Sequence, residues 1–116
     1  MKIGSIVILC YEFDKMVDFW VQALNYKMPK PVENGFVILR DPNGNGPDIS
    51  LDKVETKRIG KRSRLHLDLY AENQEEEVNR LVALGAAKYP WNYGSDTPDY
   101  VVLQDPDDNL FCVVQI

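Results

Sequence analysis

Hydrophobic residues near the start of this chain form two patterns. The first is a continuous, strand-like run, and the second has the spacing of one face of a helix. Residues 5–10 are rich in β-branched side chains and are bounded by polar ones, which predicts a largely buried strand. The next segment carries apolar side chains at the spacing of one helix face, namely Met16, Phe19, Trp20, Ala23 and Leu24. We therefore expect an amphipathic helix directly after the first strand.

Polar and turn-forming residues mark the ends of this helix and divide the segment that follows it. Asp14 is the candidate N-cap, and Asn25 can adopt the left-handed conformation that commonly ends a helix. Residues 41–47 are dense in Asp, Pro, Asn and Gly, which favour turns. We expect three short strands in this part of the chain, near residues 26–30, 35–40 and 47–54.

The second half of the chain repeats this order of elements. Residues 65–70 predict a strand, and a helix is expected over residues 74–84. Asn73 and Glu76 have the spacing of a capping box, and the glutamates of the first helical turn favour the positive end of the helix dipole. Strands should follow near residues 86–91, 99–104 and 110–115.

Two stretches of ten residues, 36–45 and 100–109, are alike without a gap. Each runs from an aromatic residue through a short apolar strand into an Asp-Pro turn. The chain therefore predicts a duplicated βαβββ module and an α+β fold, in which each helix covers one face of a mostly antiparallel sheet. Within a single domain we place module one at about 1–54, a basic linker at about 55–64 and module two at about 65–116.

Composition and charge narrow the classes of protein without identifying one. The chain has 116 residues, 45% of them hydrophobic and 27% charged, which is typical of a globular domain. A net charge of -5 argues against a nucleic-acid partner, because nucleic-acid binding rests on basic side chains. The longest apolar run, residues 6–10, is far shorter than a membrane helix, and no signal-peptide pattern precedes it. We therefore expect a cytoplasmic protein with no membrane partner.

The basic residues and the cysteines each support a specific prediction. Residues 53–64 hold six of the thirteen basic residues, and this segment is either a solvated connector between the modules or a flap that attracts anions. Cys10 and Cys112 both lie within apolar, strand-like runs. We expect two small buried hydrophobic residues there rather than a disulfide.

Four motifs carry a resemblance that covers nearly the whole chain. They are Asp-Phe-Trp at 18–20 ahead of Leu-Asn-Tyr at 24–26, Arg-Leu-His-Leu-Asp-Leu at 64–69, Leu-Val-Ala-Leu-Gly-Ala at 81–86, and Asp-Pro-Asp-Asp-Asn-Leu-Phe-Cys at 105–112. The pattern resembles the vicinal oxygen chelate superfamily, which includes glyoxalase-like proteins, bleomycin-resistance binders and extradiol dioxygenases. The resemblance implies that the sheets of two modules curl around one concavity, and that homodimers are common. In members that catalyse, four side chains from the module strands hold a divalent metal.

The resemblance also places the family's four metal-ligand positions in this sequence, at Ser5, at or near Ser50, at His66 and at Cys112. Only His66 matches the family's usual ligands, and one imidazole with two hydroxyls cannot supply the charge that a divalent metal needs. A Cys112 thiolate with His66 would favour zinc only weakly. We therefore expect the standard metal site to be lost and no cofactor to be bound. An atypical ion would be gathered by His66 with Asp48 and Asp52.

Strand alternation names the side chains that face the expected concavity. With His66 facing inward, the same parity selects Ser5, Asp48, Ser50, Asp52, Asp68, Tyr70 and Cys112 as candidate ligand-binding or catalytic residues. So polar a lining needs water or a ligand with hydrogen-bond donors, since buried carboxylates without partners are costly. Trp91 and Tyr93, in a turn-rich loop, either stack on a flat ligand at the cavity mouth or pack as a lid.

Three functions remain open on the sequence alone. The first, which we favour, is a protein of glyoxalase-like fold that binds a small organic molecule without the family's metal chemistry. The second is a lyase or isomerase in which His66, supported by Asp68, moves a proton, either metal-free or with an atypical ion. His66 can equally serve as a structural hydrogen-bonding group. The third function is an interaction or structural domain whose main property is homodimerisation.

Overall fold

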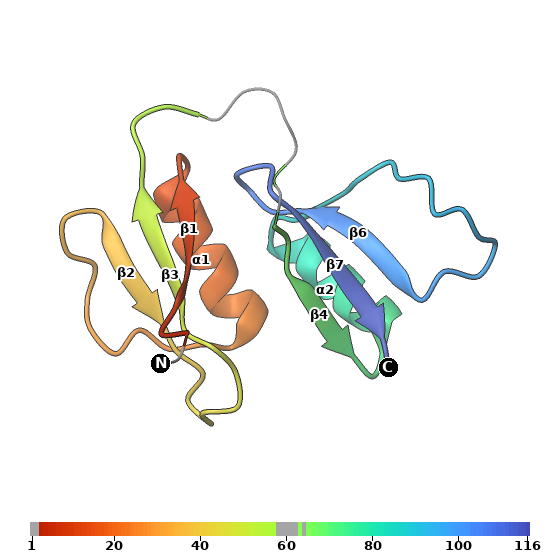
Figure 1. The fold of residues 1–116 in the computed structure, drawn as a ribbon, viewed down its shortest axis with the longest axis horizontal. Coiled ribbons are helices and arrows are strands. Elements are labelled where there is room, and N and C mark those ends of the chain that lie inside the picture. Colours follow the sequence, from red (N-terminus) through yellow and green to blue (C-terminus); the bar gives the residue numbers. More distant parts are fainter. Residues whose placement is uncertain (1–2, 58–62, 64) are drawn as a thin grey trace. The chain divides into compact units, whose positions relative to one another are not determined.

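The chain is seen here as a computed structural model, which describes residues 3–57, 63 and 65–116. It divides into two compact units, Met1–Ile59 and Gly60–Ile116, and in each a helix packs on a sheet (Figure 1). This arrangement confirms the expected α+β class with two modules. The expected basic linker lies largely outside the described residues. Within those residues, neither helix is long and apolar enough to cross a membrane.

The first unit combines one helix with a three-stranded mixed sheet. Its elements are, in chain order, β1 (Ile6–Cys10), α1 (Phe13–Leu24), β2 (Phe36–Leu39) and β3 (Ile49–Lys53). The strand order is β1-β3-β2, with β1 parallel and β2 antiparallel to the central β3. Helix α1 and strand β2 both lie between β1 and β3 in the chain, which gives the long connection that a parallel pair needs.

The segment after α1 differs from the sequence prediction. Residues 26–30 form no strand and contribute only one antiparallel bridge, between Lys27 and Arg40. The strand expected there is wrong because Pro29 and Pro31 lack the N–H that a sheet ladder requires. The first sheet therefore has one strand fewer than the repeat predicts.

The two ends of α1 confirm one prediction and overturn another. Asn25 ends the helix in the left-handed conformation, with φ at 54°. Asp14 is not the N-cap, because the helix begins one residue earlier and its cap residue is Glu12, which makes no side-chain cap hydrogen bond. Asp14 lies in the first turn instead, where its charge interacts favourably with the positive end of the helix dipole.

The apolar face of α1 forms the core of the first unit with the sheet. Phe19 and Trp20 are each 1% exposed, and their rings meet edge to face with centroids 5.0 Å apart. Trp20 is therefore a core residue, as its place on the helical stripe predicts. Cys10 is fully buried at the end of β1, and neither it nor Cys112 forms a disulfide.

The second unit combines one helix with a four-stranded sheet in the order β4-β7-β6-β5. Its elements are β4 (Asp68–Ala71), α2 (Gln74–Leu84), β5 (Ala87–Lys88), β6 (Tyr100–Gln104) and β7 (Leu110–Gln115). Strand β4 is parallel to β7, and the other two pairs are antiparallel. Both β4 and β5 are shorter than predicted, since β4 begins only at Asp68 and β5 ends before Pro90.

Helix α2 has the bounds that its capping residues predict. The side chain of Asn73 accepts a hydrogen bond from the Glu76 N–H at 3.2 Å and donates one to the Glu76 carboxylate at 3.0 Å. The next residue ties the helix to the sheet, because the Gln74 side-chain amide donates to the carbonyl oxygen of Val113 at 2.9 Å. The start of α2 is thus fixed both locally and against β7.

The two Asp-Pro turns use the same hydrogen bonds in both units. In each turn the aspartate, Asp41 or Asp105, accepts backbone N–H bonds from the residues two and four positions later. The fourth residue has a positive φ in both turns, 69° at Gly44 and 66° at Asp108. This confirms the structural role that the repeat predicts for the two aspartates.

Replacing Gly44 by Ala should lower the free energy of unfolding by about 1–2 kcal/mol, because an L-residue with a side chain is strained in the left-handed region. A Cβ at Gly44 would meet no heavy atom within 4 Å, so the cost is confined to the backbone. Gly4→Ala is the matched control, since a Cβ there also meets nothing within 4 Å and φ is not in the left-handed range. Urea denaturation compares the two variants, and equal losses of stability would contradict the backbone explanation.

Candidate ligand-binding site

Strand register decides which side chains share the open face of the second sheet, away from α2. Asp68 on β4 pairs with Cys112 on β7, and Val102 on β6 pairs with Cys112 from the other side. Tyr100 and Val114 form the next pair on the same face of β6 and β7. Since side chains alternate along a strand, all of these residues face the same way.

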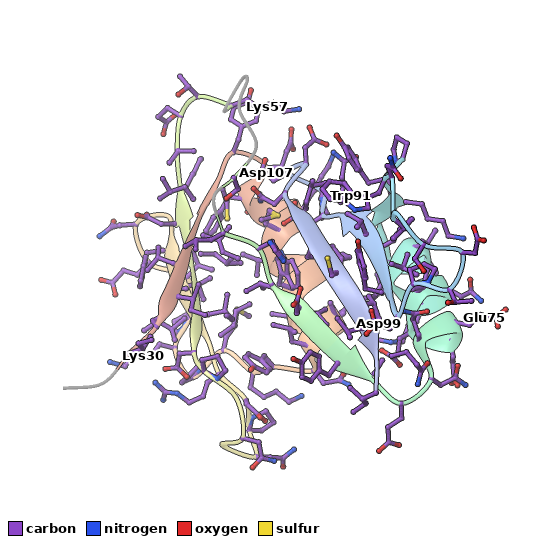
Figure 2. All side chains as sticks on the ribbon, turned by 45° about the vertical axis from the view of Figure 1, so that its right-hand side comes forward. Lys30, Lys57, Glu75, Trp91, Asp99 and Asp107 are labelled. Atoms are coloured by element: carbon purple, nitrogen blue, oxygen red, sulfur yellow. The ribbon has the colours of Figure 1, made fainter. Side chains whose placement is uncertain are left out.

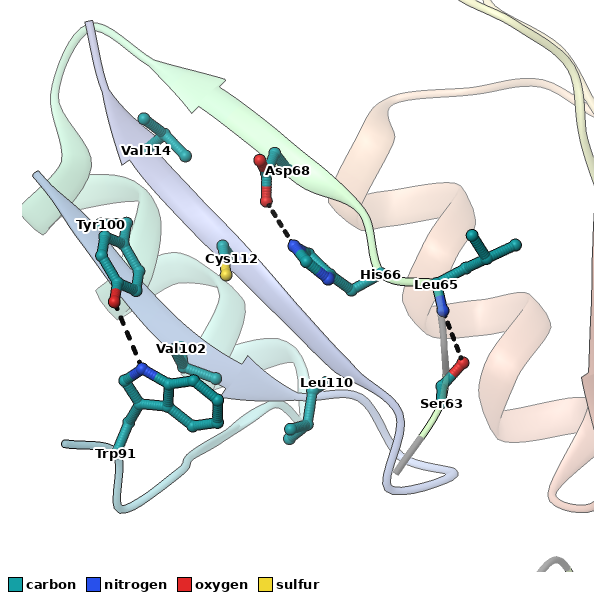
Figure 3. Close-up of a pocket in the computed structure, with 10 residues that line it drawn as sticks. All are labelled: Ser63, Leu65, His66, Asp68, Trp91, Tyr100, Val102, Leu110, Cys112 and Val114. Atoms are coloured by element: carbon teal, nitrogen blue, oxygen red, sulfur yellow. Dashed lines mark hydrogen bonds and ion pairs between the residues drawn. The ribbon is translucent and has the colours of Figure 1, made fainter. Parts of the chain in front are cut away.

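A cavity of about 270 Å³ lies on this open face (Figure 3). All of its lining residues belong to the second unit. Its polar side is formed by Ser63, His66, Asp68 and Cys112. Its apolar and aromatic lining residues are Leu65, Trp91, Tyr100, Val102, Leu110 and Val114, with Trp91 and Tyr100 side by side (Figure 3). A cavity with one polar and one aromatic side suits a small molecule that has both kinds of surface.

The polar side of the cavity contains a paired imidazole and carboxylate. The Nε2 atom of His66 lies 3.2 Å from Oδ1 of Asp68, and both side chains are 49% exposed. A contact this exposed adds little to folding stability, because water screens it. The pair instead fixes the direction of the imidazole ring, and it leaves both groups accessible to a molecule in the cavity.

Cys112 completes a group of three possible metal ligands on this face. The sulfur of Cys112, a ring nitrogen of His66 and a carboxylate oxygen of Asp68 all lie within 4.8 Å of one another. Cys112 is only partly buried, so the prediction of a buried hydrophobic residue holds for Cys10 and is wrong for Cys112. The open face of the sheet accounts for this difference, because β7 lines the cavity at that position.

The loop between β5 and β6 brings one of its two predicted aromatics into the cavity. Trp91 and Asp99 lie near the two ends of this loop (Figure 2). Trp91 lines the cavity, and its indole N–H donates to the Tyr100 hydroxyl at 3.3 Å. The Tyr93 hydroxyl accepts the backbone N–H of Val102 at 3.0 Å. Tyr93 therefore extends the hydrogen bonding along the edge of β6 and does not line the cavity.

The remaining predicted residues lie elsewhere in the structure. Tyr70 is on the cavity face of β4 but beyond the cavity, and it is 70% exposed. In the first unit, the hydroxyls of Ser5 and Ser50 hydrogen-bond to each other, and Ser50 is 1% exposed. The Asp48 carboxylate accepts three hydrogen bonds from the Arg40 guanidinium, at 2.9, 3.1 and 3.2 Å. Asp52 is partly buried on β3. The expected ligand set of His66 with Asp48 and Asp52 spans both units and stays a prediction.

Several cavity residues were not predicted from the sequence. Tyr100, Val102 and Leu110 line the cavity because of the pairing of β6 with β7. Alternation along one strand predicts which residues share a face, but it does not give the offset between two strands. The aligned Asp-Pro turn could have supplied that offset, since it joins β6 directly to β7.

Residues 5–114 match the family model described as the glyoxalase-like domain, and the chain therefore belongs to that family. The match confirms the resemblance found in the sequence motifs and spans both units. No curated protein matches the chain significantly.

Solved structures with a similar fold lie within the same superfamily. A glyoxalase/bleomycin resistance protein/dioxygenase family enzyme from Burkholderia phytofirmans PsJN is 17% identical, with a TM-score of 0.72 and 97% of each chain covered. A mutant of the fosfomycin resistance protein FosX from Listeria monocytogenes, complexed with Mn(II) and 1S,2S-dihydroxypropylphosphonic acid, is 16% identical. Its TM-score is 0.75 over 97% of this chain and 88% of that one. Glyoxalase I of Leishmania major is 14% identical, with a TM-score of 0.70 over 99% of this chain and 86% of that one. These likenesses show a shared fold.

Manganese, the ion named for the FosX complex, is poorly matched to the group of His66, Asp68 and Cys112 on the second sheet. Manganese prefers oxygen ligands, whereas the group on the second sheet contains a cysteine sulfur. Ser5 and Ser50 bring neutral hydroxyls that already bond to each other. The sulfur of this group is therefore a poor ligand for manganese.

Tyr93→Phe should lower the free energy of unfolding by about 1 kcal/mol, because the Val102 N–H would lose its acceptor. Tyr70→Phe is the matched control: it removes a hydroxyl from a side chain that is 70% exposed, and its effect should stay within about 0.5 kcal/mol. Chemical denaturation of both variants provides the measurement. If Tyr93→Phe leaves the free energy of unfolding unchanged, the hydrogen bond from Val102 does not stabilise the fold, which would contradict this assignment.

Proposed function

We propose that this protein binds a small, partly planar organic molecule in the cavity on the second sheet, and that it does so without the four-ligand metal site of catalytic relatives. The observation that carries the proposal is the cavity itself, in which an aromatic wall faces an imidazole and a carboxylate. Binding sites for small molecules commonly combine a mostly apolar lining with a few well-placed polar groups.

The volume of the cavity limits the size of this molecule. At about 270 Å³ the cavity lies just below the usual range for small-molecule sites, which favours a compact metabolite over an extended cofactor. A flat group can pack against Trp91, whose indole is held by the Tyr100 hydroxyl. His66 can donate and Asp68 can accept hydrogen bonds at the other side, so the ligand would present complementary groups there.

The relatives support a small-molecule role for this fold. The FosX complex contains a small phosphonic acid, and glyoxalase I of Leishmania major is described as trypanothione-dependent. Homodimer formation, which the sequence resemblance implies, stays a prediction for this chain. So does its location in the cytoplasm.

Replacing Trp91 by Ala should weaken ligand binding about tenfold, the effect of losing about 1.4 kcal/mol of stacking. The ligand is first sought by thermal shift in a panel of ring-containing carboxylic acids and ketones, with a chelator present. Binding is then measured by calorimetry for the wild type, for Trp91→Ala and for a control variant, Tyr70→Ala. Tyr70→Ala is the control, because Tyr70 is an exposed aromatic on the same sheet face outside the cavity. Equal losses in the two variants, or no hit in the panel, would count against the proposal.

A second candidate function is proton transfer by a lyase or isomerase, which the distance of 3.2 Å between His66 Nε2 and Asp68 Oδ1 favours. A carboxylate at this distance orients an imidazole so that its free nitrogen can take a proton from a molecule in the cavity. His66 would be the general base, and Asp68 would hold the ring and stabilise its charged form.

The proton-transfer function predicts that His66→Ala abolishes turnover of a screened substrate while the circular dichroism spectrum and melting temperature stay close to those of the wild type. Both side chains are about half exposed, so the substitution should not unfold the chain. General-base catalysis typically contributes about 10²–10⁴-fold, and the rate should fall by at least that factor. Turnover that survives the substitution would rule out this function.

A further inference from the structure

We propose that Tyr100 selects the ligand of this cavity by donating a hydrogen bond to a carbonyl oxygen, and that the ligand is a flat, ring-containing carbonyl compound with a hydrogen-bond donor at its other end. The inference rests on the binding function proposed above, and it adds the chemical class of the ligand and its orientation. The observation that carries it is the hydrogen bond from the Trp91 indole N–H to the Tyr100 hydroxyl.

The chemistry of the two side chains fixes the direction of this hydrogen bond. An indole N–H can only donate, so the Tyr100 oxygen is the acceptor. A phenol also has one proton of its own to donate. Within the described part of the chain, no protein group accepts that proton. Because Tyr100 lines the cavity, its O–H can donate to a molecule bound there.

Tyr100 is held in place by two aromatic residues of the loop before β6. The rings of Tyr93 and Tyr100 pack with centroids 5.1 Å apart, and the Tyr93 hydroxyl is itself fixed by the Val102 N–H. The Trp91 N–H occupies one acceptor position of the Tyr100 oxygen, which restricts the rotation of the hydroxyl. A donor that is already oriented loses less entropy on binding than a freely rotating one, so it can contribute more to selectivity.

The second polar group that would contact the ligand stands on a different strand. Tyr100 lies on β6 and Asp68 on β4, with β7 between them. Figure 3 shows Cys112 of β7 between the Tyr100–Trp91 pair and the His66–Asp68 pair. Two strand spacings of about 4.8 Å place the backbones of β4 and β6 about 10 Å apart. A single ring with a polar group at each end suits this separation and the cavity volume of about 270 Å³.

The two sides of the cavity require opposite groups on the ligand. Tyr100 donates, so the group that meets it must be an acceptor, whereas an ionised Asp68 can only accept, so the group that meets it must be a donor. A carbonyl conjugated with the ring lies in the plane of the ring. The molecule therefore stays flat and can also pack against the Trp91 indole.

The experiment uses the full chain and three ring compounds that differ by one group. The compound para-hydroxyacetophenone has both a carbonyl and a hydroxyl, para-ethylphenol lacks the carbonyl, and acetophenone lacks the hydroxyl. Dissociation constants are measured by NMR titration. We expect para-hydroxyacetophenone to bind about fivefold more tightly than para-ethylphenol, which is the effect of about one net hydrogen bond. Equal affinities in the wild type, or no binding of any of the three compounds, would overturn the proposal.

Replacing Tyr100 by Phe removes the donor and keeps the ring. Tyr100→Phe should abolish the preference for the carbonyl, so that para-hydroxyacetophenone and para-ethylphenol bind about equally. The affinity for para-ethylphenol, which has no carbonyl, should stay close to that of the wild type and thereby shows that the cavity is intact. Tyr70→Phe is the matched control and should keep the full preference, because Tyr70 is 70% exposed and lies outside the cavity. A preference for the carbonyl that survives in Tyr100→Phe would refute the role of its hydroxyl.

Trp91→Phe tests whether Trp91 is a positioning residue for the Tyr100 hydroxyl. The substitution keeps an aromatic ring and removes the indole N–H that fixes the Tyr100 oxygen. We expect the preference for the carbonyl to lie between those of the wild type and Tyr100→Phe. Loss of packing alone would weaken the binding of both compounds and leave their ratio unchanged, and that result would contradict the positioning role.

Asp68→Ala tests the orientation of the ligand. It should abolish the preference for para-hydroxyacetophenone over acetophenone and leave the preference over para-ethylphenol unchanged. Loss of both preferences together would contradict the proposed orientation. The proposed function fails separately: if Trp91→Ala does not weaken the binding of these compounds, they do not bind in the cavity. If Trp91→Ala weakens all three but the wild type has no preference for the carbonyl, the cavity binds small molecules and only the role of Tyr100 is wrong.

Discussion

The parallel pairing of β4 with β7 is the constraint on which the cavity depends. A parallel pair needs a crossover between its strands, and α2 provides it while covering one face of the sheet. The other face is then free to form the cavity. The register is equally important, because a slip of one residue would turn Asp68 and Cys112 toward the core. Bonds from the Gln74 side chain to β7 and the burial of Phe111 and Val113 hold that register in place.

The cavity walls differ in how they are stabilised. His66 and Asp68 lie half in solvent, so they avoid most of the free-energy cost of burying charge. Trp91 and Tyr93, in contrast, use their polar atoms within the protein, against Tyr100 and a β6 amide. The aromatic wall is thus preorganised, while the polar side keeps hydrogen-bond donors and acceptors accessible from the cavity.

The sequence predicted most of the fold and part of the site. Local signals were reliable where one residue makes a specific bond, as Asn73 does at the start of α2 and Asn25 at the end of α1. They failed at residues 26–30, where prolines outweigh the repeat. Alternation placed Asp68 and Cys112 beside His66, but it could not place Tyr100 or Val102, whose position depends on pairing between strands. The hydrogen bond from a β6 amide to the Tyr93 hydroxyl cannot be predicted from the local sequence either.

The two halves of this repeat have diverged unequally. In the first half, the hydroxyls of Ser5 and Ser50 satisfy each other, whereas the second half keeps reactive side chains around an accessible cavity. The first half thus closes these polar groups on each other, whereas the second half leaves His66 and Asp68 half exposed. Two copies of one module therefore present different chemical surfaces on similar backbones.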